Sequence, residues 1–327
     1  MKITIIGTGY VGLITGICLA EMGNQVICVD NDDEKIDKLN GGNLQIYEPG
    51  LNIIYSRIRK EDRLHFISDL SEAIINTDII FLALPTPSEE DGSADISTVL
   101  AVSTELAKLF SGAKRSGNFT YKRVVNKSTV PVGTSAKIKA IFKESGLVIG
   151  KDFDVASNPE FLREGHAVED FMRPDRIVIG VSSPKAEKIL KEIYNPFVRS
   201  GNPIIVMDEK SAEMTKYASN SYLEARITFI NEIANLCEQT GANVDHVRYG
   251  MGTDRRIGTK FLYPGMGFGG SCFPKDVRAL SALAEKSGYD FQMLKSILNV
   301  NRLQRTQIIK RITDHFGNNL KDLRIAV

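Results

Sequence analysis

A glycine-rich turn between a short strand and a helix is the feature of this sequence that most restricts its fold. Residues Ile3–Ile6 form a β-branched run, the turn Gly7-Thr-Gly-Tyr-Val-Gly12 follows directly, and apolar residues recur at helical spacing from Val11 to Met22. A second apolar run, Gln25–Val29, comes next and ends at Asp30. The order strand, tight turn, helix and strand predicts a βαβ unit with two parallel strands.

The spacing of the three glycines predicts a dinucleotide site, the alternative being a bare turn without a ligand. In such a turn the first glycine permits the bend, the second lets a pyrophosphate approach the backbone, and the third lets helix and strand pack closely. Asp30 would accept hydrogen bonds from ribose hydroxyls and repel a 2′-phosphate, which favours NAD over NADP, and Lys35 would soften that preference. The residues assigned to NAD in this unit are Gly7, Gly9, Tyr10, Val11, Gly12, Asp30 and Lys35.

Strand-like and helical segments alternate through the first two thirds of the chain. Further strands are predicted at residues 78–84, 123–126, 153–156 and 176–180, with helices at 96–110 and 135–144. This alternation predicts an α/β fold whose N-terminal part is a Rossmann-type doubly wound parallel sheet with helices on both faces.

The pattern changes after residue 206. Residues 211–239 contain no Pro or Gly and have apolar residues at helical spacing, which predicts one helix about 45 Å long that would connect domains or line a subunit interface. Helices are also predicted from Lys275 and at 291–316. We therefore expect an NAD-binding Rossmann-like domain at 1–207, an all-α central dimerisation domain at 208–317, and the first strand of a truncated C-terminal domain at 318–327.

Composition and charge exclude several classes of partner. The 327 residues carry a formal net charge of +1, with basic and acidic residues intermixed, so no nucleic acid partner is predicted. No run of 18 apolar residues occurs, and glycines interrupt the apolar N-terminal stretch that could pass for a signal peptide, so no membrane partner is expected. Four separated cysteines and four histidines predict no metal site and suit reduced thiols in the cytoplasm.

One cysteine stands in a setting that suits a nucleophile. The stretch Gly267-Phe-Gly-Gly-Ser-Cys-Phe-Pro-Lys-Asp276 places Cys272 after glycines that leave room for a substrate and before a proline and a lysine that suit a positively charged helix start. The alternative, a small buried apolar side chain, is assigned to Cys18, Cys28 and Cys237. A thiolate beside NAD can add to an aldehyde, giving a thiohemiacetal that loses hydride to become a thioester.

Two pairs of polar residues at a spacing of four could assist such chemistry. Glu160 and Glu164 would share one face if their segment is helical and could activate water, although solvated acids of a helix turn explain them equally well. Lys216 and Asn220 would project from one face of the long helix. They form either a solvated stripe or a cation and an amide donor for a developing oxyanion.

Seven segments together resemble the nucleotide-sugar 6-dehydrogenases, the UDP-glucose/GDP-mannose dehydrogenase family. They are Gly7-Thr-Gly-Tyr-Val-Gly12, Pro85-Thr-Pro87, Lys127-Ser-Thr-Val-Pro-Val-Gly-Thr134, Ser157-Asn-Pro-Glu-Phe-Leu-Arg-Glu-Gly165, Lys216 with Asn220, Asp254-Arg-Arg-Ile-Gly258, and the stretch around Cys272. They follow the family order from residue 1 to about residue 300.

The resemblance implies a four-electron oxidation in which the C6 alcohol of UDP-glucose becomes the carboxylate of UDP-glucuronate while two NAD are reduced in turn. It implies that Cys272 holds the aldehyde and then the thioester, and that Lys216 and Asn220 stabilise the oxyanion. Asp276 would position water or share protons with Lys216, and Glu160 with Thr129 would handle water and proton transfers.

The resemblance also implies further contacts. Glu164 would touch both NAD and substrate, and Thr86, Thr129 and Lys275 fall in segments that contact the cofactor. The implied substrate contacts are Glu160, Phe161, Leu162, Arg163, Glu164, Lys216, Asn220, Arg256, Phe261, Leu262, Tyr263, Pro264, Gly265 and Gly269. Arg256 matches a residue that reaches a diphosphate in the neighbouring subunit, so a homodimer through the long helix is implied.

The resemblance leaves alternatives open. Family members carry a third, Rossmann-like domain over the uridine, and this chain ends within what resembles its first strand. GDP-mannose is the alternative substrate, UDP-N-acetylmannosamine fits less well around Cys272, and a silent NAD-binding regulatory subunit is the alternative from another functional class. A catalytically silent subunit would have no need for all five of the residues that the resemblance assigns to the reaction. The sequence contains them all: Cys272, Lys216, Asn220, Asp276 and Glu160.

Overall fold

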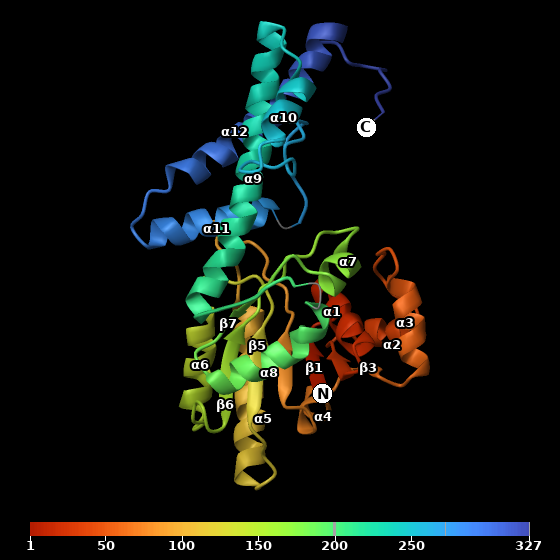
Figure 1. Cartoon of the computed structure of the whole chain (residues 1–327), viewed down its shortest axis with the longest axis vertical. Helices are drawn as coiled ribbons and strands as arrows, with labels where there is room; N and C mark the ends of the chain where they lie inside the picture. The colour runs from red at the N-terminus through yellow and green to blue at the C-terminus, as the bar shows by residue number, and fades with distance from the viewer. Residues whose placement is uncertain (199–200, 272, 327) are drawn as a thin grey trace. The chain divides into compact units, whose positions relative to one another are not determined.

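The structure is a computed structural model that describes residues 1–198, 201–271 and 273–326, and these form two compact units (Figure 1). Unit 1 comprises residues 1–87 and 94–216, and unit 2 comprises the described residues of 88–93 and 217–327. The strands of unit 1 are β1 (Lys2–Ile6), β2 (Gln25–Val29), β3 (Leu64–Ile67), β4 (Ile79–Leu82), β5 (Lys122–Asn126), β6 (Phe153–Ser157), β7 (Ile177–Gly180) and β8 (Ile204–Met207). Its helices are α1 (Tyr10–Glu21), α2 (Asp33–Asn40), α3 (Leu51–Lys60), α4 (Leu70–Ile75), α5 (Ser97–Arg115), α6 (Thr134–Glu144), α7 (Ala167–Met172), α8 (Pro184–Tyr194) and the 3₁₀ turn η1 (Asn195–Phe197).

The strands form one sheet in the order β3-β2-β1-β4-β5-β6-β7-β8, which confirms the predicted α/β class. Strands β1 to β6 are parallel, and β1 lies between β2 and β4. The chain therefore leaves β1 in one direction to build β2 and β3 and in the other to build β4, β5 and β6. The carboxyl ends of these strands meet at one edge, where parallel sheets bind ligands.

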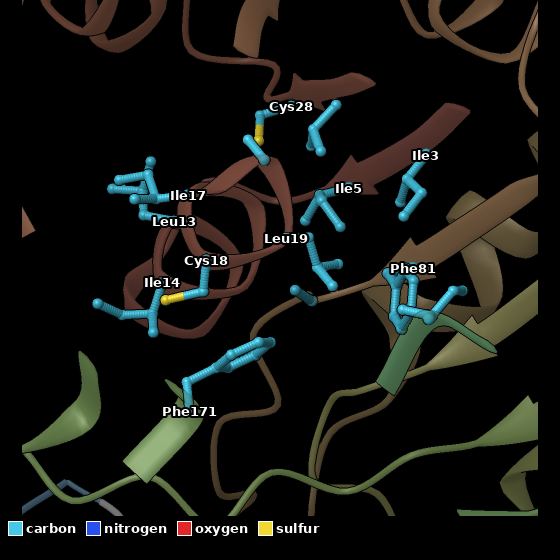
Figure 2. Packing of buried hydrophobic residues seen from close by; sticks show 14 of the residues in the cluster. Ile3, Ile5, Leu13, Ile14, Ile17, Cys18, Leu19, Cys28, Phe81 and Phe171 are labelled. Carbon is cyan, nitrogen blue, oxygen red and sulfur yellow. The ribbon is translucent and has the colours of Figure 1, made fainter. Parts of the chain in front are cut away.

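Two apolar cores cover the two faces of the sheet because successive strand side chains point to opposite faces. Ile3 and Ile5 of β1 pack in one core with α1, α3, α7 and α8, whereas Ile6 packs in the other with α5 and α6. Residues 12–20 of α1 are all buried, and Leu13, Ile14, Ile17, Cys18 and Leu19 among them pack in the first core (Figure 2). The apolar N-terminal stretch is thus the central strand and helix of unit 1. Cys18 and Cys28 are buried there as free thiols, as predicted, and Cys237 is buried elsewhere.

Strand β7 departs from the predicted parallel arrangement. It pairs with β6 in the antiparallel sense through Ser157 and Gly180, and β8 runs parallel to β7. An antiparallel neighbour starts at the edge where the preceding strand ends, so residues 158–176 need not cross the sheet. This connection, which includes Glu160–Glu164, therefore stays at the ligand-binding edge.

Unit 2 is helical in its described part. The predicted long helix is confirmed as α9 (Glu209–Thr240), whose first eight residues belong to unit 1, and α10 (Val244–Gly252), α11 (Phe273–Lys286) and α12 (Gln292–Phe316) follow. Residues 318–326 form turns and irregular backbone where a strand was predicted, and no neighbouring strand pairs with their backbone groups. Among the described helices, none combines the length and apolar character required to cross a bilayer.

The contact between α1 and β2 yields a test of how closely this core is packed. A Cβ added at Gly16 would lie 2.5 Å from the Sγ atom of Cys28 and no closer than 3.7 Å to any other atom among its nearest neighbours. We expect Gly16→Ala to destabilise the protein by about 1–3 kcal/mol, although alanine is favoured over glycine in a helix by about 1 kcal/mol. In a Cys28→Ala background, which removes the sulfur, the same change should be neutral or stabilising. Urea unfolding of both single variants and the double variant measures this coupling, and additive effects would contradict the contact.

Candidate active site

Five strands of unit 1 deliver the predicted site residues to one edge of the sheet. The glycine turn follows β1, Asp30 follows β2, and the loops after β4, β5 and β6 carry Thr86, Thr129 and the segment 160–164. These loops are far apart in sequence. The shared direction of the strands is what brings them to the same edge.

The glycine turn has the geometry that a pyrophosphate requires. Gly7 has φ +98°, and a Cβ there would lie 2.4 Å from the carbonyl oxygen of Ala83. A Cβ at Gly12 would lie 1.8 Å from the oxygen of Gly7. A Cβ at Gly9, which precedes the first residue of α1, would have no heavy atom within 4 Å. The chain itself thus excludes side chains at the first and third glycines, while the second leaves open space before a helix N-terminus, which fits a bound dinucleotide phosphate.

Asp30 is held as an ionised acceptor at the end of β2. Its Oδ2 accepts hydrogen bonds from the amide and hydroxyl of Thr8 at 2.8 and 2.6 Å and from Lys35 Nζ at 2.8 Å. Burial alone would raise the pKa of Asp30, but the hydrogen bonds from Lys35 and Thr8 outweigh it and hold the pKa below its ordinary value. The ammonium group of Lys35 is therefore bound to Asp30. The carboxylate can still accept hydrogen bonds from ribose hydroxyls through its remaining lone pairs.

Glu48 is a buried residue at this edge that the sequence analysis missed. Its Oε1 accepts hydrogen bonds from the Tyr10 hydroxyl and from the Gly165 amide at 2.6 Å, and its Oε2 accepts the Ala167 amide at 3.1 Å. Burial, and then the bond to Glu48, raise the pKa of Tyr10. Glu48 thereby ties the first residue of α1 to the end of the 160–164 segment. No motif surrounds it, so only the fold reveals this role.

The loops after β4 and β5 are also joined. The hydroxyl of Thr86 donates to the backbone oxygen of Thr129 at 2.8 Å, and the Leu84 amide donates to the Ser128 hydroxyl at 2.8 Å. Thr86 is buried and Thr129 is partly exposed. Two residues that the resemblance assigned to the cofactor therefore lie in one hydrogen-bonded pair of loops.

A buried charge cluster lies beside these loops. Lys216 Nζ donates to Glu160 Oε1 at 2.8 Å, and the Leu162 amide donates to Glu160 Oε2 at 2.6 Å. Burial opposes ionisation of Glu160, but the charge and hydrogen bond of Lys216, the Leu162 amide and the charge of Lys127 hold its pKa below the ordinary value. Complete burial lowers the pKa of Lys127 to about 8, against the attraction of Glu160 and with the repulsion of Lys216. Lys127 belongs to one of the seven family-like segments, but the sequence predicted no role for it.

The segment 160–164 is not helical, so the condition for Glu160 and Glu164 to share a helix face is not met. Glu160 is buried, whereas Arg163 and Glu164 are exposed. The ring of Phe161 lies beneath Lys216 Nζ, 5.3 Å from its centroid, and Arg163 is paired with Asp170. The proline in Asn-Pro-Glu and these tertiary contacts favour an irregular loop over the helix turn suggested by the spacing.

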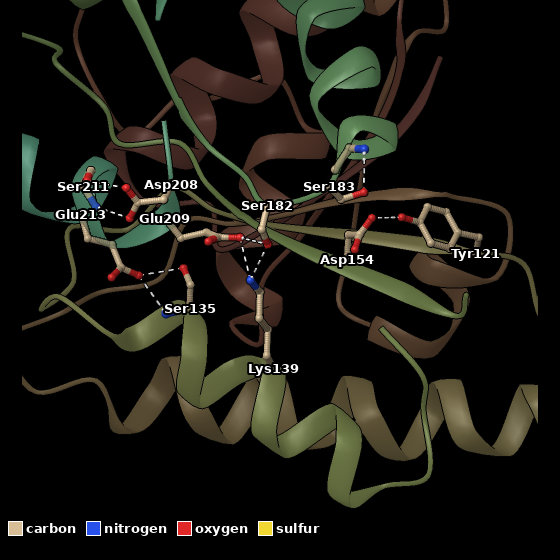
Figure 3. A network of polar contacts seen from close by, with 11 residues as sticks. Tyr121, Ser135, Lys139, Asp154, Ser182, Ser183, Asp208, Glu209, Ser211 and Glu213 are labelled. Carbon is tan, nitrogen blue, oxygen red and sulfur yellow. Dashed lines mark hydrogen bonds and ion pairs between the residues drawn. The ribbon is translucent and has the colours of Figure 1, made fainter. Parts of the chain in front are cut away.

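The first turns of α9 fix the loop after β5 as well as Glu160. Glu213 accepts hydrogen bonds from the Gly133 and Ser135 amides at 2.6 and 2.8 Å, and Glu209 accepts Lys139 Nζ at 2.6 Å (Figure 3). Glu213 thus caps the start of α6, immediately after the Thr129 loop. One helix start therefore positions both the loop after β5 and the carboxylate after β6.

In unit 2 the described catalytic candidates form a second buried group. Asn220 Nδ2 donates to Asp276 Oδ2 at 2.7 Å, and Lys275 Nζ donates to Asp276 Oδ1 at 2.8 Å. Only 1% of Asp276 is exposed, and Asn220 is buried. Asp276 thus has an amide and a cation as its observed partners. Cys272 lies outside the described residues.

Amide side chains hold the glycine-rich loop that precedes α11. Asn231 of α9 accepts from the Gly265 amide, and Asn301 of α12 accepts from the Phe268 amide, both at 2.8 Å. Gln304 donates to the Gly265 oxygen at 2.8 Å. Among the predicted contacts in this loop, Leu262 is buried, Phe261 and Pro264 are half-buried, and Tyr263, Gly265 and Gly269 are exposed.

Arg256 lies on the surface, with 88% of its side chain exposed. Its guanidinium pairs with Asp254, at 2.6 Å between Nη2 and Oδ2. An exposed arginine that is oriented by a carboxylate can present its remaining donors outward. The described residues contain no group of three or more His, Cys, Asp or Glu side chains arranged for a metal ion.

Comparison with known proteins matches both parts of the chain to one family. The NAD binding domain of the UDP-glucose/GDP-mannose dehydrogenase family matches residues 1–198, and the central domain of that family matches residues 210–303. The chain is 44% identical to UDP-glucose 6-dehydrogenase of Pseudomonas aeruginosa, over 100% of this chain and 71% of that protein.

Solved structures agree with this match. A UDP-glucose dehydrogenase from the archaeon Pyrobaculum islandicum is 36% identical with a TM-score of 0.90, and the alignment covers 97% of this chain and 71% of that one. A GDP-mannose dehydrogenase from Pseudomonas aeruginosa is 35% identical with a TM-score of 0.74, over 96% of this chain and 71% of that one. The chain therefore belongs to the UDP-glucose/GDP-mannose dehydrogenase family and is an NAD-dependent nucleotide-sugar dehydrogenase.

Proposed function

We propose that the protein oxidises UDP-glucose to UDP-glucuronate, with two NAD reduced for each sugar. The observation that carries the proposal is the buried Lys216–Glu160 pair at the edge of the sheet that also bears the cofactor turn. A buried cation and an ionised carboxylate beside a nicotinamide site are the groups that oxidation to an acid requires. The choice of UDP-glucose is supported by the 44% identity to a UDP-glucose 6-dehydrogenase.

The chemistry proceeds in two oxidations and one hydrolysis. The glycine turn would hold NAD, which would supply the hydride acceptor for each oxidation, the first NADH being exchanged for a second NAD. In the first oxidation C6 of the sugar loses a hydride and the hydroxyl proton leaves to a base, which gives an aldehyde. The Cys272 thiolate adds to the aldehyde carbon, and the resulting thiohemiacetal loses a second hydride to give a thioester. Water then attacks the thioester carbon and the C–S bond breaks, which releases the carboxylate and a proton and regenerates the thiol of Cys272.

The chain's buried polar groups have roles that fit these steps. Lys216 and Asn220 stabilise the alkoxide that develops at C6, and Glu160 together with Thr129 orders water and moves protons. Asp276, which receives hydrogen bonds from Asn220 and Lys275, positions the attacking water. The role of Asp276 is proposed with these observed partners rather than with proton sharing by Lys216.

The remaining predicted residues bind the ends of the two ligands. Glu164, Thr86 and Lys275 contact NAD, residues 160–164 and 261–265 with Gly269 contact the sugar nucleotide, and Arg256 reaches the diphosphate of a substrate in the neighbouring subunit. The exposed, oriented guanidinium of Arg256 supports that role. GDP-mannose remains the alternative substrate, because a GDP-mannose dehydrogenase is 35% identical to this chain.

Counting the NADH formed per sugar tests the proposed reaction. The protein incubated with limiting UDP-glucose and excess NAD should form two NADH per sugar, and with GDP-mannose none. Cys272→Ser should form no acid while its NAD affinity stays within about twofold, because the cofactor turn lies on another part of the chain. Absorbance of NADH and chromatography of the product measure both. No NADH with either sugar, or full acid formation by Cys272→Ser, would overturn the proposal.

We also propose a homodimer formed through α9. Tyr222, Phe229 and Leu236 are spaced by seven residues on this helix and are 62%, 51% and 55% exposed. Residues seven apart lie on one face of a helix, and a stripe of large apolar side chains on such a face is the seam by which helices pair. A second copy of this chain supplies the same stripe by symmetry.

A charge placed in the stripe should separate the subunits. Phe229→Glu should convert the dimer to a monomer, because pairing would bury two like charges across a symmetric seam. Ile53→Glu, at an exposed position on α3, makes the same change in unit 1 and should leave the dimer intact. Light scattering after size-exclusion chromatography gives the masses. A wild-type monomer, or a Phe229→Glu dimer, would refute the α9 interface.

A further inference from the structure

Glu224 is a buried carboxyl group that the proposed reaction does not use. It lies on α9 in unit 2 with 0% of its surface exposed, and neither carboxyl oxygen has a hydrogen-bond partner within the described part of the chain. The buried carboxylates of Glu160 and Asp276, in contrast, are each bonded to a lysine. A buried polar group without a partner is rare in folded proteins and requires a physical explanation.

Two further hydroxyl groups on the same helix share this property. Ser221 and Thr228 are buried, and their hydroxyl oxygens have no partner among the described residues, not even the carbonyl one turn back. They stand three residues before and four residues after Glu224, so all three side chains lie on one face of α9 on neighbouring turns. Such a row supplies the two to four polar partners that an ordered internal water requires.

This row lies next to Asp276. Asn220, one turn before Glu224 on the same face of α9, donates to Asp276, whose charge acts on Glu224. Asp276 on α11 is in turn bonded by Lys275, and no described cation bonds to Glu224. Burial first, and then the charge of Asp276, raise the pKa of Glu224 from 4.5 to about 9. Glu224 therefore differs from Asp276 by lacking the cation that would stabilise its charged form.

We propose that Glu224 carries a proton at neutral pH and, through water held by Ser221 and Thr228, exchanges protons with Asp276. The catalytic part of this inference rests on the proposed function. Conversion of an alcohol, two NAD and water to a carboxylate and two NADH releases three protons, so a buried site needs a route by which protons leave. A carboxylic acid can accept a proton on one oxygen as it releases one from the other. An amide cannot.

The protonation state is tested by stability, without any need for activity. Glu224→Gln replaces the neutral acid with a neutral group of nearly the same shape. A raised folded-state pKa stabilises the protein fully below the unfolded value of 4.5, and this stabilisation is lost as pH rises towards 9. The urea midpoint of the variant should therefore rise relative to wild type between pH 5 and 9. Glu105→Gln removes an exposed acid from α5, and its difference from wild type should stay constant over this range.

The proton-transfer role is tested by kinetics with UDP-glucose. Glu224→Gln should lower kcat by about tenfold or more, with KM within about twofold, because the loss concerns proton movement and not substrate contacts. The wild-type rate should decline above pH 9, because Glu224 then becomes charged next to Asp276. The rate of Glu224→Gln should show no such decline. Glu105→Gln should keep the wild-type pH profile.

Each outcome decides one part of the proposal. A pH-independent difference in urea midpoint would show that Glu224 is ionised at neutral pH and would overturn the inference. A pH-dependent difference with unchanged kcat and pH profile would overturn the exchange with Asp276. If wild-type protein oxidises no nucleotide sugar, the proposed function fails, while the urea measurement still determines the state of Glu224.

Discussion

The ion pair between Lys216 and Glu160 is the interaction on which the rest of the site depends. Both groups are buried, and removing two charges from water is costly unless they pair and their remaining hydrogen-bonding capacity is satisfied. Here the Leu162 amide bonds the second carboxylate oxygen, and Lys127 adds a further positive charge. The pair therefore holds the start of α9 against the loop after β6, and that loop is tied through Glu48 to the first residue of α1.

Two of the buried glutamates, Glu160 and Glu224, show how a partner decides the protonation state of an acid. The bond from Lys216 helps hold the pKa of Glu160 below its ordinary value, whereas Glu224 bonds to no described cation and the charge of Asp276 adds to burial in raising its pKa. Burial opposes ionisation of both groups, and the nearby charges and hydrogen bonds account for the opposite directions of their pKa shifts. In the proposed reaction the two groups would have different roles, because Glu160 would hold the positive charge of Lys216 in place and Glu224 would carry protons.

The sequence predicted the parts of the fold that depend on local pattern. The β-branched run, the spaced glycines and the apolar period of α1 predicted the first βαβ unit, and the absence of Pro and Gly predicted α9. The direction of β7 was not predictable, because side-chain periodicity is the same for parallel and antiparallel strands.

The residues of the candidate site also divide into those that the sequence indicated and those that only the fold revealed. The sequence alone indicated Gly7, Gly12 and Asp30, because each stands at a position of the dinucleotide-binding motif where the turn, the helix packing or the ribose requires that residue type. Glu48 and Glu224 stand in no motif. The first acts through amides more than 100 residues away, and the second is recognised only from its burial and missing partners. Glu160 and Glu164 would share a face only if their segment were helical, but proline and tertiary contacts make that segment a loop.

The most direct measurement of the central claim is the kcat of a variant in which the buried pair is replaced by neutral groups. Lys216→Met alone leaves the Glu160 carboxylate without its partner and should destabilise the protein by about 3–5 kcal/mol. Adding Glu160→Gln removes that charge and should restore stability in urea. If the pair serves the reaction as well as the fold, the double variant is stable yet at least about a hundredfold slower with UDP-glucose. A stable double variant with the kcat of wild type would show that the pair only supports the structure, and would contradict the account.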